Sequence, residues 1–446
     1  MKKKTTGAYF WILVWGLGLA GQLCWNIENQ WFNTFVYEKI AKDPTIISWM
    51  VGVSATATTI STFVSGTLSD RRGRRKLCVA IGYILWGIFT IAYGCTEFIV
   101  KGAAGTDSSL LMTAAVAVVA ADAIMSFFGS MGNDSGFNAW INDHMDDSNR
   151  GQIGAALATQ PIIGTIVGTV AGGMLVGAEN NYMRLFLVMG GFVILCGVLA
   201  LCTMKDAEGL KPYVSGSFRQ QFAGVFNFKK YFALRELVWV NFTLAAYFIA
   251  FNMYFTHLGN YMIYYLGFAA DMMGYIEGIA LVLAMLMVIP ATKLINKNKS
   301  PLVCLIAVCL NIVGLLILAF TVTPANIDPT TIFNWNLLIG VFIVGTGYVV
   351  FLQTISVWGK ALYPEETKGQ FEGIRILFFV LIPMIVAPLL SNPIIKKSGE
   401  IVNDYGLTEY LPTEVLFKWA AAISLITFVP LYFAAKYHKL RVKTGE

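Results

Sequence analysis

Long apolar runs alternate with short polar gaps along almost the whole chain. Twelve of these runs reach the roughly 20 residues that a helix needs to cross the hydrocarbon core of a bilayer. They cover residues 8–39, 46–69, 77–99, 110–140, 152–178, 184–204, 237–266, 271–294, 301–323, 335–359, 370–395 and 414–435. The pattern therefore predicts an all-α membrane protein with 12 transmembrane helices.

The longest gap on the predicted inner side covers residues 205–236 and divides the spans into six plus six. We expect an N-terminal six-helix half at 1–204, a cytoplasmic linker at 205–236 and a C-terminal six-helix half at 237–446. A short echo indicates a duplicated unit, because Arg-Gly-Gln at 150–152 recurs as Lys-Gly-Gln at 368–370. Internal repeats of this kind are a common plan of secondary transporters.

Composition narrows the class of protein. Charged residues make up 13% of the chain, against about 25% in soluble domains, which excludes a typical soluble enzyme. The net charge of +6 comes from Lys and Arg in short gaps beside the apolar runs. Lipid headgroups are therefore the expected neighbours of these residues, and nucleic acid is not an expected partner.

The basic residues also predict the orientation. With the N-terminus in the cytoplasm, 24 of the 32 Lys and Arg lie in or beside inner segments and six face outward. Positively charged loops stay on the cytoplasmic side, so both termini are expected there. The start, with Lys2, Lys3 and Lys4 before an apolar run, is compatible with a signal peptide. The run continues through Trp25 and Trp31 without a clear cleavage site, so we interpret it as the first retained span.

Residues that carry catalysis or bind metals are scattered. All seven cysteines lie in apolar runs without metal-type spacing, and the three histidines stand far apart in sequence. There is no Walker-type phosphate loop and no nucleophile pattern. We therefore expect neither an enzyme nor an ATPase, and no metal or cofactor.

The first inner gap carries the most specific motif, GTLSDRRGRRK over residues 66–76. It resembles the signature loop between helices 2 and 3 of the major facilitator superfamily, which implies the 12-helix major facilitator fold. In that family the loop braces helix 2 against helix 11 in the outward-open state. The resemblance thus implies gating roles for Gly66, Asp70, Arg71, Gly73 and Arg74. The alternative is a basic loop that only sets the topology.

Within the superfamily, the polar, aromatic first helix resembles that of glycoside, pentoside and hexuronide symporters. The arginines at 71–75 resemble a motif of sucrose-type symporters. Helix 2 lacks the paired aspartates with which the melibiose branch binds sodium. Helix 5 has Gln160 where the motif of drug and proton antiporters has glycine, and helix 4 lacks their arginine. The resemblance therefore disfavours an exporter.

By the same resemblance, helices 1, 4, 7 and 10 line a central cavity. At 100° per residue, polar side chains form one stripe on helix 1 and another on helix 4. We predict a substrate site from Gln22, Trp25, Asn26, Asn29 and Asn33 of helix 1 and Asp122, Ser126 and Asn133 of helix 4. Amides and a carboxylate can bond to hydroxyls, and an aromatic ring can cover the apolar face of a sugar. The alternative is that the amides only hydrogen-bond neighbouring helices.

The second half offers further candidates. Helix 7 has Tyr247 at the head of a tyrosine stripe with seven-residue spacing, and Asn252 on roughly the opposite side. Helix 10 adds Tyr348 and Gln353. A tyrosine stripe is also typical of helix packing, so both interpretations remain open.

Acidic residues inside spans are costly and point to coupling. Asp122 lies about twelve residues into its span, roughly 18 Å deep at 1.5 Å per residue, where burial favours proton binding. Glu28 and Glu277 are further coupling candidates, although Glu28 could hold a neighbouring helix and Glu277 could reach the interface. Glu372 and Arg375, one turn apart, are expected to pair and to act in gating.

These patterns predict a proton-coupled importer of a sugar or glycoside that works by alternating access. Sodium remains possible as the coupling ion. An exporter of an amphipathic compound and a transport-inactive sugar sensor are the alternatives. The short outer loops lack Asn-X-Ser/Thr sequons, which indicates a multi-pass protein of the bacterial plasma membrane, and we expect a monomer.

Overall fold

The computed structural model describes residues 7–100, 108–145, 149–207, 209–214, 216–224, 228–363, 368–403 and 406–444. Twelve helical segments in this part of the chain are long and apolar enough to span a membrane, which confirms the predicted number and fold class. The segments are Ala8–Ile40, Pro44–Arg72, Arg75–Val100, Ser109–Asp143, Gly151–Val176, Tyr182–Thr203, Arg235–Tyr265, Ala270–Ile295, Ser300–Thr321, Trp335–Ala361, Gly373–Ser398 and Val415–Lys443. We number them helices 1 to 12.

The elements up to helix 6 are α1 (Ala8–Ile27), η1 (Glu28–Phe32), α2 (Asn33–Phe35), η2 (Val36–Ile40), α3 (Pro44–Arg72), α4 (Arg75–Gly94), α5 (Glu97–Val100), α6 (Ser108–Gly129), η3 (Ser130–Phe137), α7 (Asn138–Asp143), α8 (Arg150–Val176) and α9 (Tyr182–Thr203). The linker region contains α10 (Phe218–Gly224) and α11 (Phe228–Ala233). The remaining helices are α12 (Arg235–Asn260), η4 (Tyr261–Tyr265), α13 (Ala270–Leu286), α14 (Val288–Ile295), α15 (Ser300–Thr321), α16 (Trp335–Ala361), α17 (Lys368–Ile376), η6 (Leu377–Leu381), α18 (Ile382–Ser398), α19 (Val415–Ser424), η7 (Leu425–Thr427) and α20 (Phe428–Thr444).

Helices 1, 4, 7 and 11 are not uniformly α-helical. Each contains at least one wider π-helical segment, namely η1 and η2 in helix 1, η3 in helix 4, η4 in helix 7 and η6 in helix 11. A π turn takes an extra residue, so it rotates the residues beyond it relative to a regular 3.6-residue repeat. The predicted stripe on helix 1 assumes a constant 100° per residue, and η1 interrupts that repeat between Asn29 and Asn33.

The chain packs into two compact units. The first comprises Met1–Asn29, Val53–Gly168 and Asn181–Val225, and the second comprises Gln30–Gly52, Thr169–Asn180 and Phe226–Glu446. The boundaries fall inside helices 1, 2 and 5. The predicted outer segments of these three helices therefore pack with the second unit.

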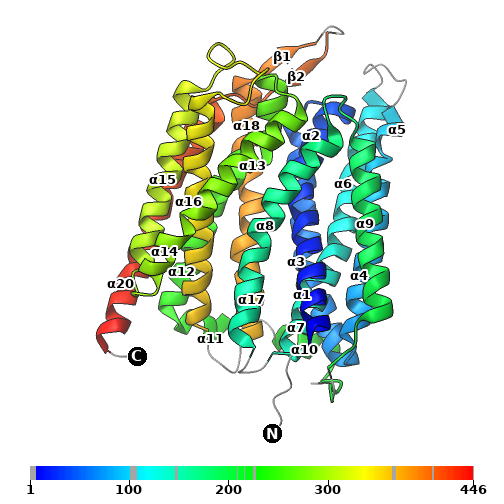
Figure 1. Ribbon diagram of the computed structural model, residues 1–446, viewed down its shortest axis with the longest axis vertical. Helices are drawn as coiled ribbons and strands as arrows, with labels where there is room; N and C mark the ends of the chain where they lie inside the picture. The colour runs from blue at the N-terminus through cyan, green and yellow to red at the C-terminus, as the bar shows by residue number, and fades with distance from the viewer. Residues whose placement is uncertain are drawn as a thin grey trace. The chain divides into compact units, whose positions relative to one another are not determined.

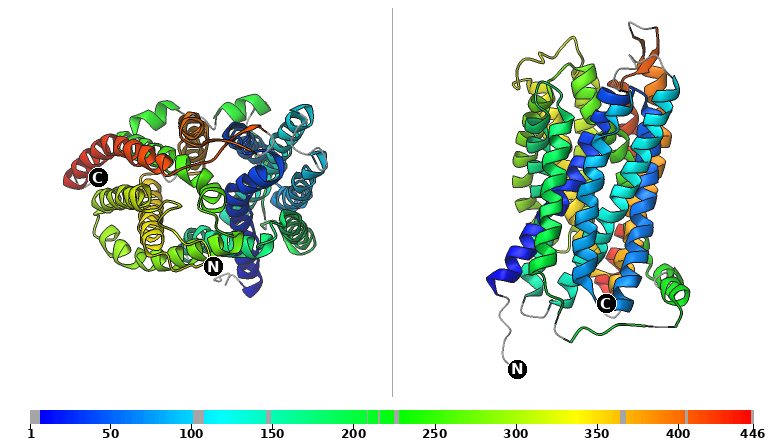
Figure 2. Two further views of the ribbon diagram at one scale, coloured as in Figure 1. Left: turned by 90° about the horizontal axis from the view of Figure 1, so that it is seen from above. Right: turned by 90° about the vertical axis from the view of Figure 1, so that its right-hand side faces the viewer.

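In the first unit, α4 packs against α6, α9 and η3 (Figures 1 and 2). Glycines permit the closest approach: a Cβ atom added to Gly82 of α4 would lie 2.4 Å from the Cα of Gly132 in η3. Helices 3 and 4 therefore touch through their backbones.

In the second unit, α15 packs against α16 and α19, and α12 packs against α18, α19 and α20. A hairpin follows helix 11, in which β1 (Glu400–Val402) pairs antiparallel with β2 (Thr408–Tyr410), with Ile401 opposite Glu409. The hairpin lies at the end of the unit opposite to the C-terminus (Figure 1).

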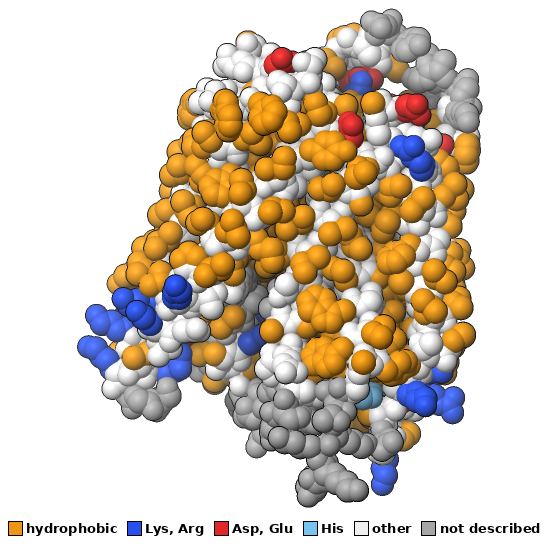
Figure 3. Space-filling model, viewed as in Figure 1, with side chains coloured by type: hydrophobic (Ala, Val, Ile, Leu, Met, Phe, Trp, Pro, Cys, Tyr) orange, Lys and Arg blue, Asp and Glu red, His pale blue; other side chains and the backbone are white. Residues whose placement is uncertain are grey.

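Hydrophobic side chains cover the middle of the helices on the face drawn in Figure 3. Most Lys and Arg side chains on this face lie at its lower end in Figure 3, and the Asp and Glu side chains lie at the upper end together with a few basic ones. Large apolar side chains on this kind of surface are strongly exposed, for example Phe320 at 68% and Ile289 at 60%. Such a band is typical of a surface that faces lipid.

Candidate functional site

Two predicted coupling residues come together in the first unit, where helix 1 meets helix 4. Ser126 Oγ donates a hydrogen bond of 2.7 Å to Glu28 Oε1. Asp122, one turn before Ser126, accepts a hydrogen bond from Ser54 of helix 2 and interacts electrostatically with Glu28. Asp122 is only 1% exposed. We call Glu28, Ser54, Asp122 and Ser126 the carboxyl cluster.

The carboxyl cluster has unused hydrogen-bonding capacity. Glu28 Oε2 and Asp122 Oδ1 have no hydrogen-bond partner among the described residues. No Lys, Arg or His side chain in the described part of the chain interacts with either acid. A buried carboxylate without a cation is costly, whereas a protonated carboxyl is not charged. The arrangement can therefore bind and release a proton.

A third acid lies next to this cluster. Asp134, in η3, accepts hydrogen bonds from Ser130, Asn133 and Trp25. The Asn133 amide nitrogen lies 3.3 Å from the Asp134 carboxylate, and the Asn133 oxygen lies 3.1 Å from the Tyr83 hydroxyl. The predicted residues Trp25 and Asn133 thus hold Asp134 in place.

The helix 1 amides divide between the two units. Gln22 and Asn26 pack against Gly164 and Gly168 of helix 5, where added Cβ atoms would lie 2.6 Å from Gln22 Cβ and 2.5 Å from Asn26 Oδ1. Asn29 donates to the carbonyl of Trp25 on its own helix, at 2.7 Å. In the second unit, the Asn33 carbonyl accepts a hydrogen bond of 3.3 Å from Asn260.

The predicted residues of helices 7 and 10 lie in the second unit. Tyr247 stacks on Phe351 with ring centroids 3.8 Å apart, and Asn252 donates to its own helix at the carbonyl of Phe248. Tyr348 stacks on Phe251, with centroids 4.6 Å apart. Gln353 donates to Thr292 at 3.1 Å, and its Oε1 atom has no partner among the described residues, nor does the Tyr247 hydroxyl.

The third predicted coupling residue, Glu277 of helix 8, is also in the second unit. Gln30 of helix 1 donates a hydrogen bond of 2.5 Å to Glu277 Oε2, and Thr169 of helix 5 donates one of 2.9 Å to Gln30 Oε1. We call these three residues the outer latch. Glu277 Oε1 has no hydrogen-bond partner in the described part of the chain.

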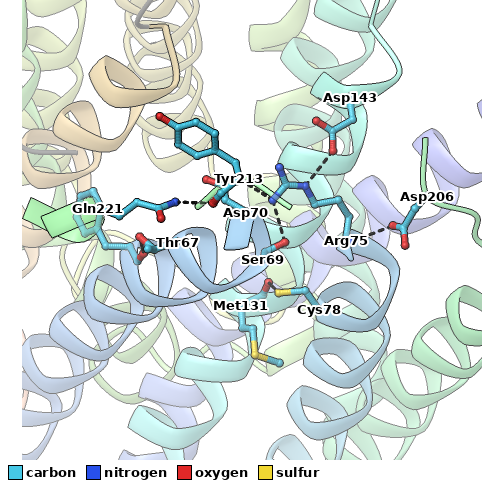
Figure 4. A network of polar contacts seen from close by, with 11 residues as sticks. Thr67, Ser69, Asp70, Arg75, Cys78, Met131, Asp143, Asp206, Tyr213 and Gln221 are labelled. Carbon is cyan, nitrogen blue, oxygen red and sulfur yellow. Dashed lines mark hydrogen bonds and ion pairs between the residues drawn. The ribbon is translucent and has the colours of Figure 1, made fainter. Parts of the chain in front are cut away.

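The signature loop forms a polar network in the first unit (Figure 4). Arg75 is its centre: the guanidinium contacts Asp70 at 2.6 Å, Ser69 at 2.9 Å and Asp143 at 2.9 Å. The resemblance implied that Arg71 and Arg74 act with Asp70. In this structure Arg75 is the arginine that pairs with Asp70, while Arg71 contacts the linker and Arg74 is exposed.

The linker docks on the same loop. Asp206 Oδ1 accepts hydrogen bonds from the backbone N–H groups of Arg75 and Lys76, at 2.9 and 2.8 Å, and so caps the start of α4. Tyr213 N–H donates to the carbonyl of Asp70 at 2.8 Å. Gly73 turns the chain with a φ of +60°, which glycine adopts without strain.

Arg71 joins the loop to α10, because it donates to the Gly216 carbonyl at 3.0 Å and to Gln221 at 3.1 Å. Among the other predicted gating residues, Gly66 faces Ser135, whose Oγ would lie 3.4 Å from an added Cβ. The guanidinium of Arg375 lies over the ring of Phe379 at 5.1 Å. The side chain of Glu372 lies outside the described part of the chain, as do residues 1–6 with the three N-terminal lysines.

Several residues in these networks were not predicted as site residues: Gln30, Ser54, Arg75, Asp134, Thr169 and Asp206. Gln30 was missed because the regular 100° repeat places it off the amide stripe. Ser54 could have been found from the composition of helix 2, which is rich in Ser and Thr for a membrane span. Among the described residues, no group of three or more His, Cys, Asp or Glu is arranged to hold a metal ion.

Comparisons with known proteins identify the family. The family model described as Major Facilitator Superfamily matches residues 14–388. A bacterial homolog of the human lysosomal transporter Spinster, in an inward-facing and unoccupied conformation, has a TM-score of 0.68 at 14% identity, covering 98% of this chain and 99% of that chain. A mutant of the nucleoside transporter NupG has a TM-score of 0.66 at 14% identity, covering 94% of this chain and 99% of that chain.

At these identities the two structures show a shared fold alone. No curated protein sequence matches this chain. The family model, however, spans most of the chain and agrees with the 12 candidate membrane helices. This multi-pass membrane protein therefore belongs to the major facilitator superfamily of secondary transporters.

Proposed function

We propose that this transporter couples the inward movement of protons to the uptake of a polyhydroxylated small molecule, a sugar or a glycoside, by alternating access. The observation that carries the proposal is the carboxyl cluster. Two acids share a hydroxyl-lined site, each has one carboxyl oxygen without a partner, and no described cation neutralises them. Such a site suits the loading of one proton.

Asp122 is the proposed proton carrier because it is the more deeply buried of the two acids. Glu28 lies on helix 1, next to Asn29 in the sequence, and Ser126 connects it to helix 4. A change in the charge of this pair would therefore alter the contact between the two helices proposed to line the substrate cavity. This connection gives substrate binding and proton loading a common structural element.

A sugar or glycoside is favoured by the polar side chains that these helices offer. Helices 1 and 4 carry amide groups, hydroxyls, carboxylates and Trp25, and helices 7 and 10 carry the stacked rings of Tyr247 and Tyr348. Hydroxyl-rich ligands use this mixture of donors, acceptors and aromatic surfaces. Nucleosides, which NupG is named for, contain a sugar and belong in the same test panel.

The test is a pH measurement outside lightly buffered proteoliposomes that contain the purified protein. Each monosaccharide, disaccharide and nucleoside of a panel is added in turn. Alkalinisation of the outer medium with one compound is the expected result, because a symporter carries protons inward with its substrate. If the protein is folded and no compound of the panel changes the outer pH, the result contradicts proton symport. Substrate uptake that requires sodium would assign the coupling to that ion.

Variants separate coupling from substrate binding. Asp122→Asn is expected to abolish proton-driven accumulation while sparing exchange of labelled substrate across the membrane. Asp328→Asn, in the exposed loop before α16, is the matched control and should leave accumulation unchanged. Accumulation retained by Asp122→Asn would contradict the assignment. Proton-driven efflux of labelled compound would instead support the exporter alternative, and binding without flux the sensor.

A further inference from the structure

The outer latch is a buried polar chain that the proposed proton-loading site does not use. Its members are nearly inaccessible: Thr169 is 1% exposed, Gln30 2% and Glu277 3%. They come from helices 5, 1 and 8, and all lie in the predicted outer halves of these helices. The hydrogen bonds of the outer latch can therefore form only while these three predicted outer segments are in contact.

Helices 5 and 8 meet through their backbones at the latch. A Cβ atom added to Gly274 would lie 2.9 Å from the carbonyl oxygen of Thr169, and one added to Gly173 would lie 2.8 Å from that of Ala270. At this separation there is no room for water between the helices. Glu277 thus has a dry environment for as long as the segments stay together.

No described charge compensates Glu277. Gln30 is the one side chain that hydrogen-bonds to it in the described part of the chain. Helix 5 offers only Thr169 and apolar residues beyond it, and η4 offers tyrosines. Apart from Glu28 of the carboxyl cluster, the charged residues of helices 1, 5, 8 and 10 outside the latch lie at or near helix ends. They are Glu38, Lys39, Arg150, Asp271, Lys293 and Lys360.

The protonation state follows from a comparison of costs. An ionised carboxylate in this position would have one hydrogen bond and no cation, and burying such an ion costs several kcal/mol even after relaxation. A neutral carboxyl that lacks a partner for its hydroxyl costs about 1–3 kcal/mol. The neutral acid is therefore the cheaper form while the helices are in contact. Once they separate, water can solvate the carboxylate.

We propose that Glu277 is a proton sensor of the outer gate: the outer ends of helices 1, 5 and 8 close on one another only while Glu277 carries a proton. Gln30 connects Glu277 to helix 5, because its amide nitrogen donates to Glu277 and its oxygen accepts a hydrogen bond from Thr169. The role in transport rests on the proposed proton coupling. In an importer, the requirement prevents the outer side from closing before a proton has arrived from outside.

The experiment measures the gate without substrate. Spin labels are placed at Ala178→Cys, after helix 5, and Ala325→Cys, after helix 9, in a background where the native cysteines are replaced by serine. Both positions are exposed and belong to the second unit. The distance between the labels is recorded in liposomes from about pH 5 to about pH 9, a range that brackets the titration of a buried carboxyl.

The closed population is expected to fall as the pH rises, because the closed state holds the proton. For one proton, the ratio of closed to open protein changes by at most about tenfold per pH unit. Glu277→Gln, which stays neutral and still accepts from Gln30, should remain closed at every pH. Thr169→Val should lower the closed fraction at each pH but keep the pH dependence.

Two results would overturn the proposal: a distance in the unsubstituted protein that does not change with pH, or an unchanged pH dependence in Glu277→Gln. Asp122→Asn tests the carboxyl cluster separately and should keep a pH-dependent distance, whereas Glu277→Gln should not. If Asp122→Asn abolishes the response, the sensor is the carboxyl cluster and not the latch. Because no substrate is present, a negative result leaves the symport proposal to its own flux test.

Discussion

Asp206 shows how a single side chain connects the linker to the signature loop. The first N–H groups of a helix have no partner within the helix, and α4 begins at Arg75 with no cap from its own N-cap residue. The linker supplies the acceptor instead, at 2.9 and 2.8 Å. The linker is therefore part of the folded first unit at this point.

Asp206→Ala should destabilise the protein by about 0.5–2 kcal/mol, the range for loss of a capping side chain. Asp206→Asn keeps an oxygen acceptor and should retain most of the stability. Thermal unfolding in detergent would show the difference as a lower Tm for the alanine variant alone. Equal losses in both variants would mean that the charge, and not the hydrogen-bond acceptor, stabilises the start of α4.

At the scale of helices, the crossing of helices 3 and 4 depends on two glycines. Gly82→Ala would place a Cβ atom 2.4 Å from the backbone of Gly132, which cannot rotate away as a side chain can. We expect a loss of about 1–3 kcal/mol, the usual cost of overpacking, and a lower Tm.

The matched control is Gly191→Ala in α9, where nothing lies within 4 Å of an added Cβ. Alanine favours a helix over glycine by about 1 kcal/mol, so this variant should be as stable as the unsubstituted protein or slightly more stable. Equal behaviour of the two variants would contradict a backbone contact between the helices.

The hairpin that follows helix 11 holds the loop between helices 1 and 2. Tyr410 N–H donates to the Lys42 carbonyl at 2.8 Å, and the Lys42 ammonium pairs with Glu409 at 3.0 Å. A partly exposed ion pair is worth about 0.2–1 kcal/mol, which corresponds to a roughly 1.4- to 5-fold change in a two-state population. Lys42→Gln should lower the ratio of closed to open protein at the outer side by this factor.

The same spin-label distance measures this effect, and about 1 M salt should reproduce it in the unsubstituted protein because salt screens exposed pairs. Lys397→Gln, at an exposed position of α18, is the control. A population that Lys42→Gln leaves unchanged would show that the backbone hydrogen bond holds the hairpin without the ion pair.

The membrane spans could be predicted from the sequence, because the length and polarity of an apolar run are local properties. The π-helical segments were not predictable in this way, since they depend on contacts such as that of Gly132 with α4. The wider turn in helix 1 brings Gln30 to Glu277, a pairing of residues 247 positions apart. The choice of Arg75 as the partner of Asp70 likewise follows from the turn at Gly73.

At the scale of the whole molecule, the orientation in the membrane decides which solution can supply a proton to Glu277. An even number of spans in the described part of the chain would put both termini on one side, and the bias of Lys and Arg predicts that this side is the cytoplasm. The hairpin and the latch would then face outward, and protons that enter from outside would reach Glu277 before the outer side closes. With the opposite orientation, the same latch would respond to the cytoplasmic pH.

Reporter fusions in a bacterial host test this directly. Green fluorescent protein at the C-terminus should fluoresce, because it matures in the cytoplasm, whereas alkaline phosphatase at the same position should be inactive. Phosphatase inserted directly after Asn403, between β1 and β2, should be active, since it needs the oxidising outer side. The reverse pattern would contradict the predicted orientation and would place the latch and the hairpin on the cytoplasmic side.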